Sequence, residues 1–240
     1  MANPAKVLAR VQTVENHGEG VYSVTFAVPS RYTRYLPGQF LHMTLEEFDP
    51  TAGFWPESRV FSIASAPRQD FVAIVYSVKG RYTRLMEQEL AVGREVWLKL
   101  PYGDFIVDEG LLADGPVVLI AGGTGVSPYL PFLMKHRESG NVHLFYGLRK
   151  PNHLLFRDEF STLKGQPWFR PHFFLEEGRL EDWPSTPGRL SIPAIAEAMG
   201  KEFPTGQYFL SGPPAMIRTF QDDLLGQGIP NNQIHIDEWE

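Results

Sequence analysis

Large apolar residues alternate with polar or small residues along the first hundred positions, most clearly at 24–28 and 72–78. Such alternation is typical of β-strands with one buried face. Runs of this kind cover residues 6–14, 20–28, 38–46, 58–65, 71–78 and 95–100, and Gly, Pro, Asn or Asp residues separate them. Six short strands at this spacing predict an antiparallel barrel, with a single helix at residues 82–90.

From residue 111 the pattern changes to apolar strands that alternate with helices. The apolar runs are 117–121, 142–146, 171–175 and 207–210, the helices are expected to start at residues 127, 155, 192 and 213, and a last strand is expected at 233–236. This order predicts a Rossmann-like parallel sheet that is covered on both faces. Acidic residues and glycines interrupt the alternation at 108–115. We therefore expect a β-barrel domain at 1–110 and an α/β domain at 111–240.

The composition is typical of globular proteins and limits the classes of partner that we expect. Its 240 residues are 43% hydrophobic and 13% aromatic, and its net charge is −6 with a pI near 5.7. An acidic chain lacks the basic face that nucleic acids need, so we expect no nucleic-acid partner. No apolar run approaches the length of a membrane span, and residues 1–9 lack the apolar core of a signal peptide. We expect a cytoplasmic protein without a membrane partner, and the oligomeric state stays open.

The sequence contains no cysteine. This excludes disulfides, thiolate zinc sites and cysteine-bound iron–sulfur clusters. Its seven histidines include no pair three or four residues apart, so a helical metal-ligand pair is absent. We expect no metal site, and any redox chemistry would depend on an organic cofactor.

The segment VVLIAGGTGVSP, at 117–128, predicts a buried strand, a glycine turn and the start of a helix. Gly122, Gly123 and Gly125 would let the backbone approach a bulky anion, and Pro128 suits a first helical turn. The amides at such a helix end attract phosphate. The pattern differs by one residue from the dinucleotide fingerprint G-x-G-x-x-G, and the alternative is an ordinary strand-to-helix turn.

Two segments of the expected barrel combine cations with small or hydroxyl residues. RVFSIAS, at 59–65, places a cation, an aromatic ring and two hydroxyls on one strand, although an edge strand with a solvated arginine has the same pattern. GRYT, at 80–83, opens the expected helix, where the first-turn amides and neighbouring arginines favour an anion. The alternative is that Thr83 only caps the helix. With the glycine turn, these segments suggest two bound nucleotides.

Near the end of the chain, YFLSGPPAM at 208–216 again predicts a strand, a glycine turn and a proline-started helix. In a parallel sheet this places Ser211 and Gly212 at the carboxyl ends of the strands, in the same crevice as the first glycine turn. The alternative is a normally capped helix.

Together, these four motifs resemble those of the ferredoxin–NADP reductase family of flavoproteins, over nearly the whole chain. RVFSIAS is similar to the family's R-x-[Tyr/Phe]-Ser-x-x-Ser flavin motif, GRYT to its second flavin phosphate loop, GGTGVSP to its nicotinamide nucleotide loop and SGPPAM to its Cys-Gly-Pro-x-x-Met segment. The closing DEWE resembles the family's acidic and aromatic tail. The resemblance implies a flavin-binding barrel and a nicotinamide-binding domain, without a fused iron–sulfur domain.

The resemblance also implies roles for individual residues. Arg59 would bind a flavin phosphate, Phe61 would lie against the isoalloxazine ring, and Ser62 would bond near its N5. Catalytic roles fall on Ser62, Ser211 and Glu238. The cofactor-binding residues are expected to be Arg59, Val60, Phe61, Ser62, Ser65, Gly80, Arg81, Tyr82, Thr83, Gly123, Thr124, Gly125, Pro128, Arg149, Lys150, Gly212, Pro213, Met216 and Trp239. Ser211 stands where the family usually has cysteine, and a hydroxyl is less polarizable than a thiol, which bears on the efficiency of hydride transfer.

Arg149 and Lys150 follow the second expected parallel strand. In dinucleotide folds this position contacts the ribose, where an acidic residue suits NAD and an arginine suits the extra phosphate of NADP. The pair favours NADP over NAD, unless both are solvated surface cations.

The resemblance implies an oxidoreductase that transfers hydride from NADPH or NADH to bound FAD, with FMN as the other possible flavin. Electrons would then pass to a separate acceptor protein, such as a ferredoxin, a flavodoxin or an oxygenase component. Two alternatives remain: a reductase of free flavin or another diffusible acceptor, and a flavin- or nucleotide-binding subunit without turnover. A serine hydrolase is excluded because GVSPY lacks the last glycine of G-x-S-x-G, and no Walker motif of an NTPase occurs.

Overall fold

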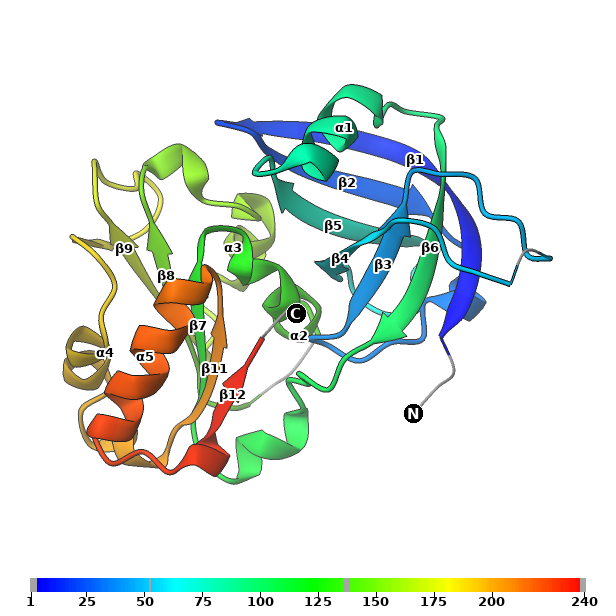
Figure 1. Ribbon diagram of the computed structural model, residues 1–240. Helices are drawn as coiled ribbons and strands as arrows, with labels where there is room; N and C mark the ends of the chain where they lie inside the picture. Colours follow the sequence, from blue (N-terminus) through cyan, green and yellow to red (C-terminus); the bar gives the residue numbers. More distant parts are fainter. Residues whose placement is uncertain (1–3, 52, 136–138, 238–240) are drawn as a thin grey trace. The chain divides into compact units, whose positions relative to one another are not determined.

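The computed structural model describes residues 4–51, 53–135 and 139–237. The chain divides into two compact units (Figure 1). The first comprises residues 1–106 and 127–135, and the second comprises residues 107–126 and 136–240.

The first unit is built on a six-stranded antiparallel sheet. Its strands are β1 (Ala5–Gly18), β2 (Val21–Ala27), β3 (Phe40–Thr44), β4 (Arg59–Ser62), β5 (Phe71–Ser77) and β6 (Glu95–Tyr102). They are ordered β4-β3-β6-β1-β2-β5, so β4 and β5 are the edges that meet as the sheet curls into a nearly closed barrel. This confirms the expected antiparallel barrel.

Hydrogen bonds join the two edge strands where the chain leaves β4. The amide of Ile63 still donates to the carbonyl of Gln39 on the β3 side (3.0 Å), but the amide of Ala64 donates to the carbonyl of Ala73 in β5 (2.8 Å). The amide of Ala73 in turn donates to the hydroxyl of Ser65 (3.0 Å). We call residues 63–65 and Ala73 the seam. Because the chain crosses from β3 to β5 here, β4 ends at Ser62, earlier than the expected 58–65.

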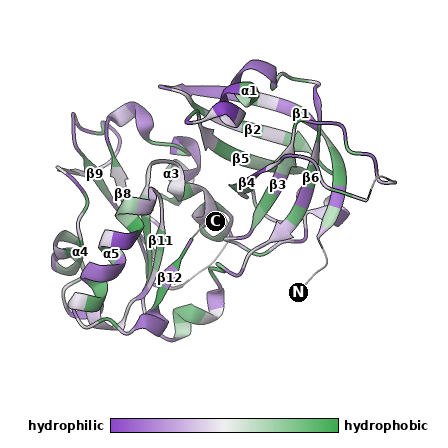
Figure 2. Cartoon of the chain, viewed as in Figure 1, coloured by the Kyte–Doolittle hydropathy of each residue, from purple (hydrophilic) through white to green (hydrophobic). Residues whose placement is uncertain are grey.

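The alternating residues of the strands fill the barrel core. Every second residue of 24–28 is fully buried, as are Val72 and Ile74 of β5. The helix α1 (Arg81–Glu89) adds Tyr82 and Met86 to the same core. Figure 2 shows hydrophobic and hydrophilic residues interspersed along the strands of the barrel, as expected for strands with one buried face. The barrel therefore provides a rigid support for the residues at its edges. The unit also contains the short helices η1 (Ser30–Tyr32) and α2 (Leu130–Leu133).

The second unit is built on a six-stranded parallel sheet, in the order β10-β9-β8-β7-β11-β12. Its strands are β7 (Val117–Gly122), β8 (Val142–Leu148), β9 (Phe169–Leu175), β10 (Ser185–Pro187), β11 (Gln207–Ser211) and β12 (Ile234–Ile236). The parallel sheet was expected, whereas β10 was not, because three residues that include Ser and Pro carry no strand pattern.

Helices cover both faces of this sheet. One face packs against α4 (Ile192–Met199) and α5 (Pro214–Gly226), which share a core with Ile120 and Phe145. On the other face, Phe160 of α3 (Arg157–Leu163) contacts the rings of Tyr146 and Phe173. Short 3₁₀ turns are η2 (Glu109–Ala113), η4 (Pro151–His153), η5 (Gly200–Thr205) and η6 (Asn231–Gln233).

One helix begins differently from the expectation. An α-helix was expected from residue 127, but the helical segment starts as a 3₁₀ turn, η3 (Gly123–Tyr129), and only residues 130–133 are α-helical. Pro128 and Pro131 lack the amide hydrogens that an α-helix needs, which explains the tight, short turns. No helix among the described residues is long and apolar enough to cross a membrane.

Candidate functional site

The two cationic motifs of the barrel meet at one place. Arg59 begins β4 and Arg81 begins α1, and the carboxylate of Glu57 joins them. Its Oε1 lies 3.0 Å from Nη2 of Arg59, and its Oε2 lies 3.1 Å from Nη2 of Arg81. We call Arg59 and Arg81 the arginine pair. The sequence suggested two separate phosphate sites, and the structure combines them into one cluster of cations on the first unit.

Tyr82 fixes the position of Arg59. The guanidinium of Arg59 lies over the Tyr82 ring at 4.8 Å, and its Nη1 donates to the carbonyl of Ser58 (2.8 Å). The buried Tyr82 hydroxyl donates to the carbonyl of Met43 (2.8 Å) and accepts from the amide of Leu45 (3.2 Å). Burial raises the pKa of Tyr82 to about 12, so the ring stays neutral beneath the cation. Arg59 is thus held in place before any ligand binds.

The start of α1 is open on the side of Gly80, because a Cβ there would meet no atom within 4 Å. The hydroxyl of Thr83 accepts hydrogen bonds from the amides of Lys79 (2.9 Å) and Gly80 (3.1 Å). Thr83 therefore caps the helix, as the alternative interpretation of this motif proposed. Any contact of Thr83 with a cofactor stays a prediction.

The residues after Arg59 point in different directions. Phe61 is buried in the barrel core, edge-to-face with Tyr76 at 6.3 Å, whereas Val60 and Ser62 are half-buried. The hydroxyl of Tyr76 is buried and has no hydrogen-bond partner among the residues that the structure describes, and burial raises its pKa. Phe61 was expected to lie against a flavin ring; its side chain is largely buried in the barrel core, and that contact stays a prediction.

Ser65 has a structural environment. It is buried, its hydroxyl lies 2.8 Å from the Tyr35 hydroxyl, and it accepts the Ala73 amide at the seam. These contacts all lie within the barrel. They account for a hydroxyl residue at this position without a cofactor.

On the second unit, two glycine-containing turns lie side by side at the carboxyl edge of the sheet. The strands β7 and β11 are neighbours, with Ala121 paired to Ser211, so the turns that follow them leave the sheet together. A Cβ on Gly125 would lie 2.3 Å from the carbonyl oxygen of Ser211, so this glycine is needed for close packing between the turns. The two turns that the sequence placed together are therefore neighbours on this unit, and a ligand crevice between them stays a prediction.

Only part of the glycine turn is open. Gly123 is exposed with φ +56°, and a Cβ there would meet nothing within 4 Å. Gly122 instead packs against Met216 and Pro213, since its Cβ would lie 2.8 Å from the Met216 sulfur. Thr124 is half-buried and Pro128 is buried in η3. Gly123 is thus the position where a ligand's phosphate can approach the backbone.

Ser211 ends β11 and is tied to the end of β12. Its hydroxyl donates to Oδ2 of Asp237 at 2.8 Å, and both side chains are buried. The amide of Asp237 donates to the carbonyl of Leu210 (2.9 Å). The sequence analysis placed Asp237 only in the acidic and aromatic tail and did not foresee its pairing with Ser211. The predicted Glu238 and Trp239 lie outside the described residues.

Arg149 and Lys150 directly follow β8, as expected. Two glutamates that follow β9 come beside them: the amides of Glu176 and Glu177 donate to the carbonyls of Leu148 (3.0 Å) and Arg149 (2.9 Å). Glu176 pairs with Arg189 at 2.9 Å. The sequence argument considered only the strand that precedes Arg149, so it missed these carboxylates.

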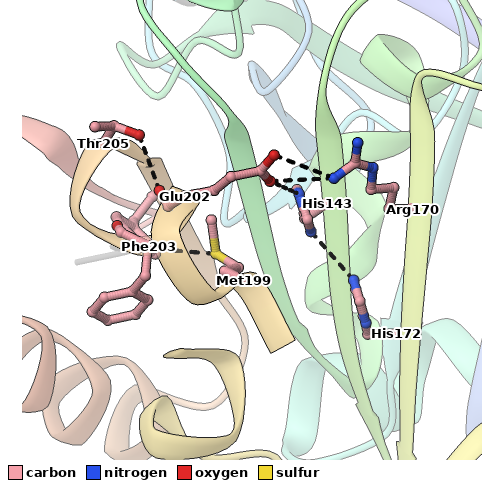
Figure 3. Close-up of polar contacts among 8 residues, drawn as sticks. His143, Arg170, His172, Met199, Glu202, Phe203 and Thr205 are labelled. Atoms are coloured by element: carbon pink, nitrogen blue, oxygen red, sulfur yellow. Dashed lines mark hydrogen bonds and ion pairs between the residues drawn. The ribbon is translucent and has the colours of Figure 1, made fainter. Parts of the chain in front are cut away.

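A partly buried polar cluster lies away from this edge, near the amino ends of β8 and β9 (Figure 3). His143 Nε2 lies 3.1 Å from Oε2 of Glu202, and His143 Nδ1 lies 3.2 Å from Nε2 of His172. Arg170 contacts the same carboxylate at 3.2 Å. Burial lowers the pKa of His143, and burial lowers the pKa of His172 to about 4. We call these four residues the histidine cluster. No group of three or more potential metal ligands was found among the described residues.

The comparisons with known proteins agree with this division of sites. Residues 6–123 match the FAD-binding domain family, and residues 119–222 match the oxidoreductase NAD-binding domain family. The reductase component of propane 2-monooxygenase from Rhodococcus jostii is 30% identical over 249 residues, which cover 97% of this chain and 63% of that protein. This chain therefore spans less than two thirds of that relative's length.

Solved structures show the same fold. The ferredoxin reductase in carbazole 1,9a-dioxygenase matches with a TM-score of 0.78 at 24% identity, over 99% of this chain and 70% of that one. A ferredoxin NADP+ reductase from Neisseria gonorrhoeae, with bound FAD and NADP, matches with a TM-score of 0.75 at 20% identity, over 97% of this chain and 98% of that one.

The residues present fit the two nucleotides that these families bind. On the first unit, the arginine pair and the open space over Gly80 suit a phosphate, and the Tyr76 hydroxyl lacks a partner within the described part of the chain. On the second unit, the exposed Gly123 backbone lies at the carboxyl edge of a parallel sheet, where dinucleotides bind. This chain therefore combines a region that matches the FAD-binding domain family with a region that matches the oxidoreductase NAD-binding domain family, and it shares its fold with a ferredoxin NADP+ reductase.

Proposed function

We propose that this protein is an NAD(P)H-dependent reductase that passes hydride to bound FAD and electrons to a separate acceptor. The observation that carries the proposal is that each unit has its own nucleotide-type site: the arginine pair on the barrel, and the paired turns after β7 and β11 on the parallel sheet. When bound, FAD accepts hydride from a nicotinamide and releases electrons to an acceptor. The protein's task is binding and placement.

On the first unit, Arg59 and Arg81 neutralise the flavin phosphates, and the first-turn amides of α1 add to their attraction. Gly80 lets the phosphate approach the backbone closely, because the space above it is open. The half-buried Ser62 stands on the same strand as Arg59 and is the hydroxyl of this motif that we assign to the flavin ring.

On the second unit, Gly123 provides the backbone against which a nucleotide phosphate binds. Ser211 contributes a hydroxyl whose hydrogen is already donated to Asp237. A serine has a single hydrogen to donate, so Ser211 can only accept a hydrogen bond from a ligand, for example from an amide N–H. Asp237 thus positions Ser211.

The domain and partner assignments belong to the same proposal. We assign flavin binding to residues 1–110 and nicotinamide binding to residues 111–240, and we place the enzyme in the cytoplasm. A separate acceptor is supported by the matching reductase component from Rhodococcus jostii. A ferredoxin, a flavodoxin or an oxygenase component would be suitable acceptors.

An anaerobic absorbance titration of the purified protein with NADPH, and separately with NADH, tests this function. We expect one equivalent of nucleotide to bleach the flavin band. Rapid turnover with free flavin alone would support the diffusible-acceptor alternative. Bound flavin that neither nucleotide bleaches would contradict a reductase and favour a non-catalytic subunit.

A further inference from the structure

The carboxylate of Glu57 accepts a hydrogen bond from each member of the arginine pair. Its Oε1 lies 3.0 Å from Nη2 of Arg59, and its Oε2 lies 3.1 Å from Nη2 of Arg81. The two arginines come from different elements, β4 and α1, and Glu57 is the link between their guanidinium groups. A phosphate that binds both arginines would use the same two donors.

The contact is not required to position Arg59. That guanidinium is already held by the Tyr82 ring and by the carbonyl of Ser58. The side chains of Glu57, Arg59 and Arg81 are 38%, 49% and 78% exposed. Ion pairs this exposed contribute little to folding stability, so the contact matters chiefly for what binds the arginines.

We propose that Glu57 is an intramolecular competitor for the flavin phosphate. A phosphate that binds both arginines must displace the Glu57 carboxylate. Because Glu57 is only two residues from Arg59 in the chain, the displaced carboxylate stays nearby and repels the phosphate. Glu57 therefore weakens FAD binding and speeds FAD release, so that the flavin exchanges with solution. This inference rests on the proposed assignment of the flavin phosphate to the arginine pair.

The test is the variant Glu57→Gln, which keeps the shape of the side chain and removes its charge. Binding of FAD, FMN and riboflavin to the flavin-depleted protein is measured by fluorescence titration, and release of FAD is measured on dilution of the loaded protein. The variant should bind FAD and FMN about tenfold more tightly and release FAD about tenfold more slowly, as expected for removal of the two exposed ion pairs of Glu57. Riboflavin has no phosphate, so its affinity should not change.

The control is Glu95→Gln on β6, which makes the same change in net charge. Glu95 pairs with Arg10 at 3.0 Å and is 50% exposed, so it matches Glu57 in environment. It should leave all three affinities as in the wild type. Equal tightening by both variants, or tightening that includes riboflavin, would overturn the inference, because the effect would not act through the phosphate.

The outcomes separate this inference from the proposed function. If the wild type binds FAD but Glu57→Gln binds it equally or more weakly, the inference is wrong and the reductase proposal stands. If the wild type binds none of the three flavins, the proposed function fails and the inference fails with it.

Discussion

Ser211 and Asp237 form a buried hydroxyl–carboxylate pair at the end of the parallel sheet. A buried carboxylate depends on hydrogen-bond donors, because it has lost its contact with water. The family's usual cysteine would place a weak S–H donor here, whereas the serine places a strong O–H donor. The serine is therefore matched to the aspartate, and its hydroxyl contributes to stability as well as to any contact with nucleotide.

Removal of this hydroxyl should destabilise the protein. We expect Ser211→Ala to lower the free energy of unfolding by about 1–3 kcal/mol, because a buried acceptor loses one of its hydrogen bonds. Urea unfolding of the two proteins measures the change. Ser161→Ala is the control, because the exposed Ser161 hydroxyl bonds only the carbonyl of Arg157 within α3 (2.8 Å). Equal losses in both variants would contradict the role given to the buried pair.

The cations after β8 should decide the choice of nicotinamide nucleotide. We expect Arg149→Ala to raise the KM for NADPH about tenfold and to change the KM for NADH little, because only NADPH carries the extra phosphate. Steady-state kinetics with both nucleotides measure the two values. Arg218→Ala, an exposed cation on α5, should change neither. A similar loss with NADH would show that Arg149 does not recognise the ribose phosphate.

At the scale of elements, the histidine cluster links β8 and β9 to η5. With both rings neutral, His172 donates to His143 and His143 donates to Glu202, so the hydrogen bonds form a continuous chain. Protonation of His172 would place a positive charge in a partly buried site and close enough to His143 and Arg170 to be disfavoured by them. The element packing therefore favours the neutral cluster.

This cluster makes stability depend on pH. Burial lowers the pKa of His172 from 6.5 to about 4, so between these values the unfolded chain binds a proton that the folded chain does not. The free energy of unfolding should have its full value above pH 6.5 and should decrease as the pH falls toward 4. We expect a loss of about 1–2 kcal/mol, which is below the full value of the shift because the side chain is partly exposed.

Urea unfolding at pH 7, 6 and 5 measures this loss. His172→Gln should flatten the dependence, whereas His17→Gln, in the barrel, should leave it as in the wild type. If the slope persists in His172→Gln, the acid sensitivity comes from other groups.

Periodicity predicted most elements, because strand alternation and glycine or proline turns act locally. The strands of the barrel, the four βα repeats and the start of α4 at Ile192 were all expected from such patterns. What could not be predicted depends on tertiary contacts. Glu57 lies in a loop, Asp237 acts through a neighbouring strand, and the packing role of Gly125 follows from the carbonyl of Ser211. The sequence identified Gly122, Gly123 and Gly125 together, but only the fold shows which one faces open space.

At the scale of the whole molecule, each unit has its own core and its own candidate nucleotide site. The barrel encloses one buried cluster, and the parallel sheet shares a separate one with α4 and α5. A substitution of Arg59 or Arg81 therefore changes no residue of the second unit's core. Binding of the two nucleotides should be separable by mutation.

We expect Arg59→Ala to weaken FAD binding by about 10- to 100-fold, as expected for the loss of a charged hydrogen-bond donor. Binding of NADP+ to the same variant, measured by calorimetry, should stay within about twofold of the wild type. Arg10→Ala on β1 is the control, and it should retain both affinities. Loss of both ligands in Arg59→Ala would contradict two independent sites.

The seam of the barrel has a consequence for how the flavin is kept. Few backbone hydrogen bonds join the edge strands β4 and β5 there. Arg59 lies on β4, and Arg81 lies at the start of α1, which follows β5 along the chain. A phosphate that binds both arginines would link the two sides of this join. A ligand that binds only the closed barrel shifts the population toward the closed barrel. Loss of flavin and local opening of the barrel would then be one coupled event, in which the amides of Ala64 and Ala73 exchange with solvent first.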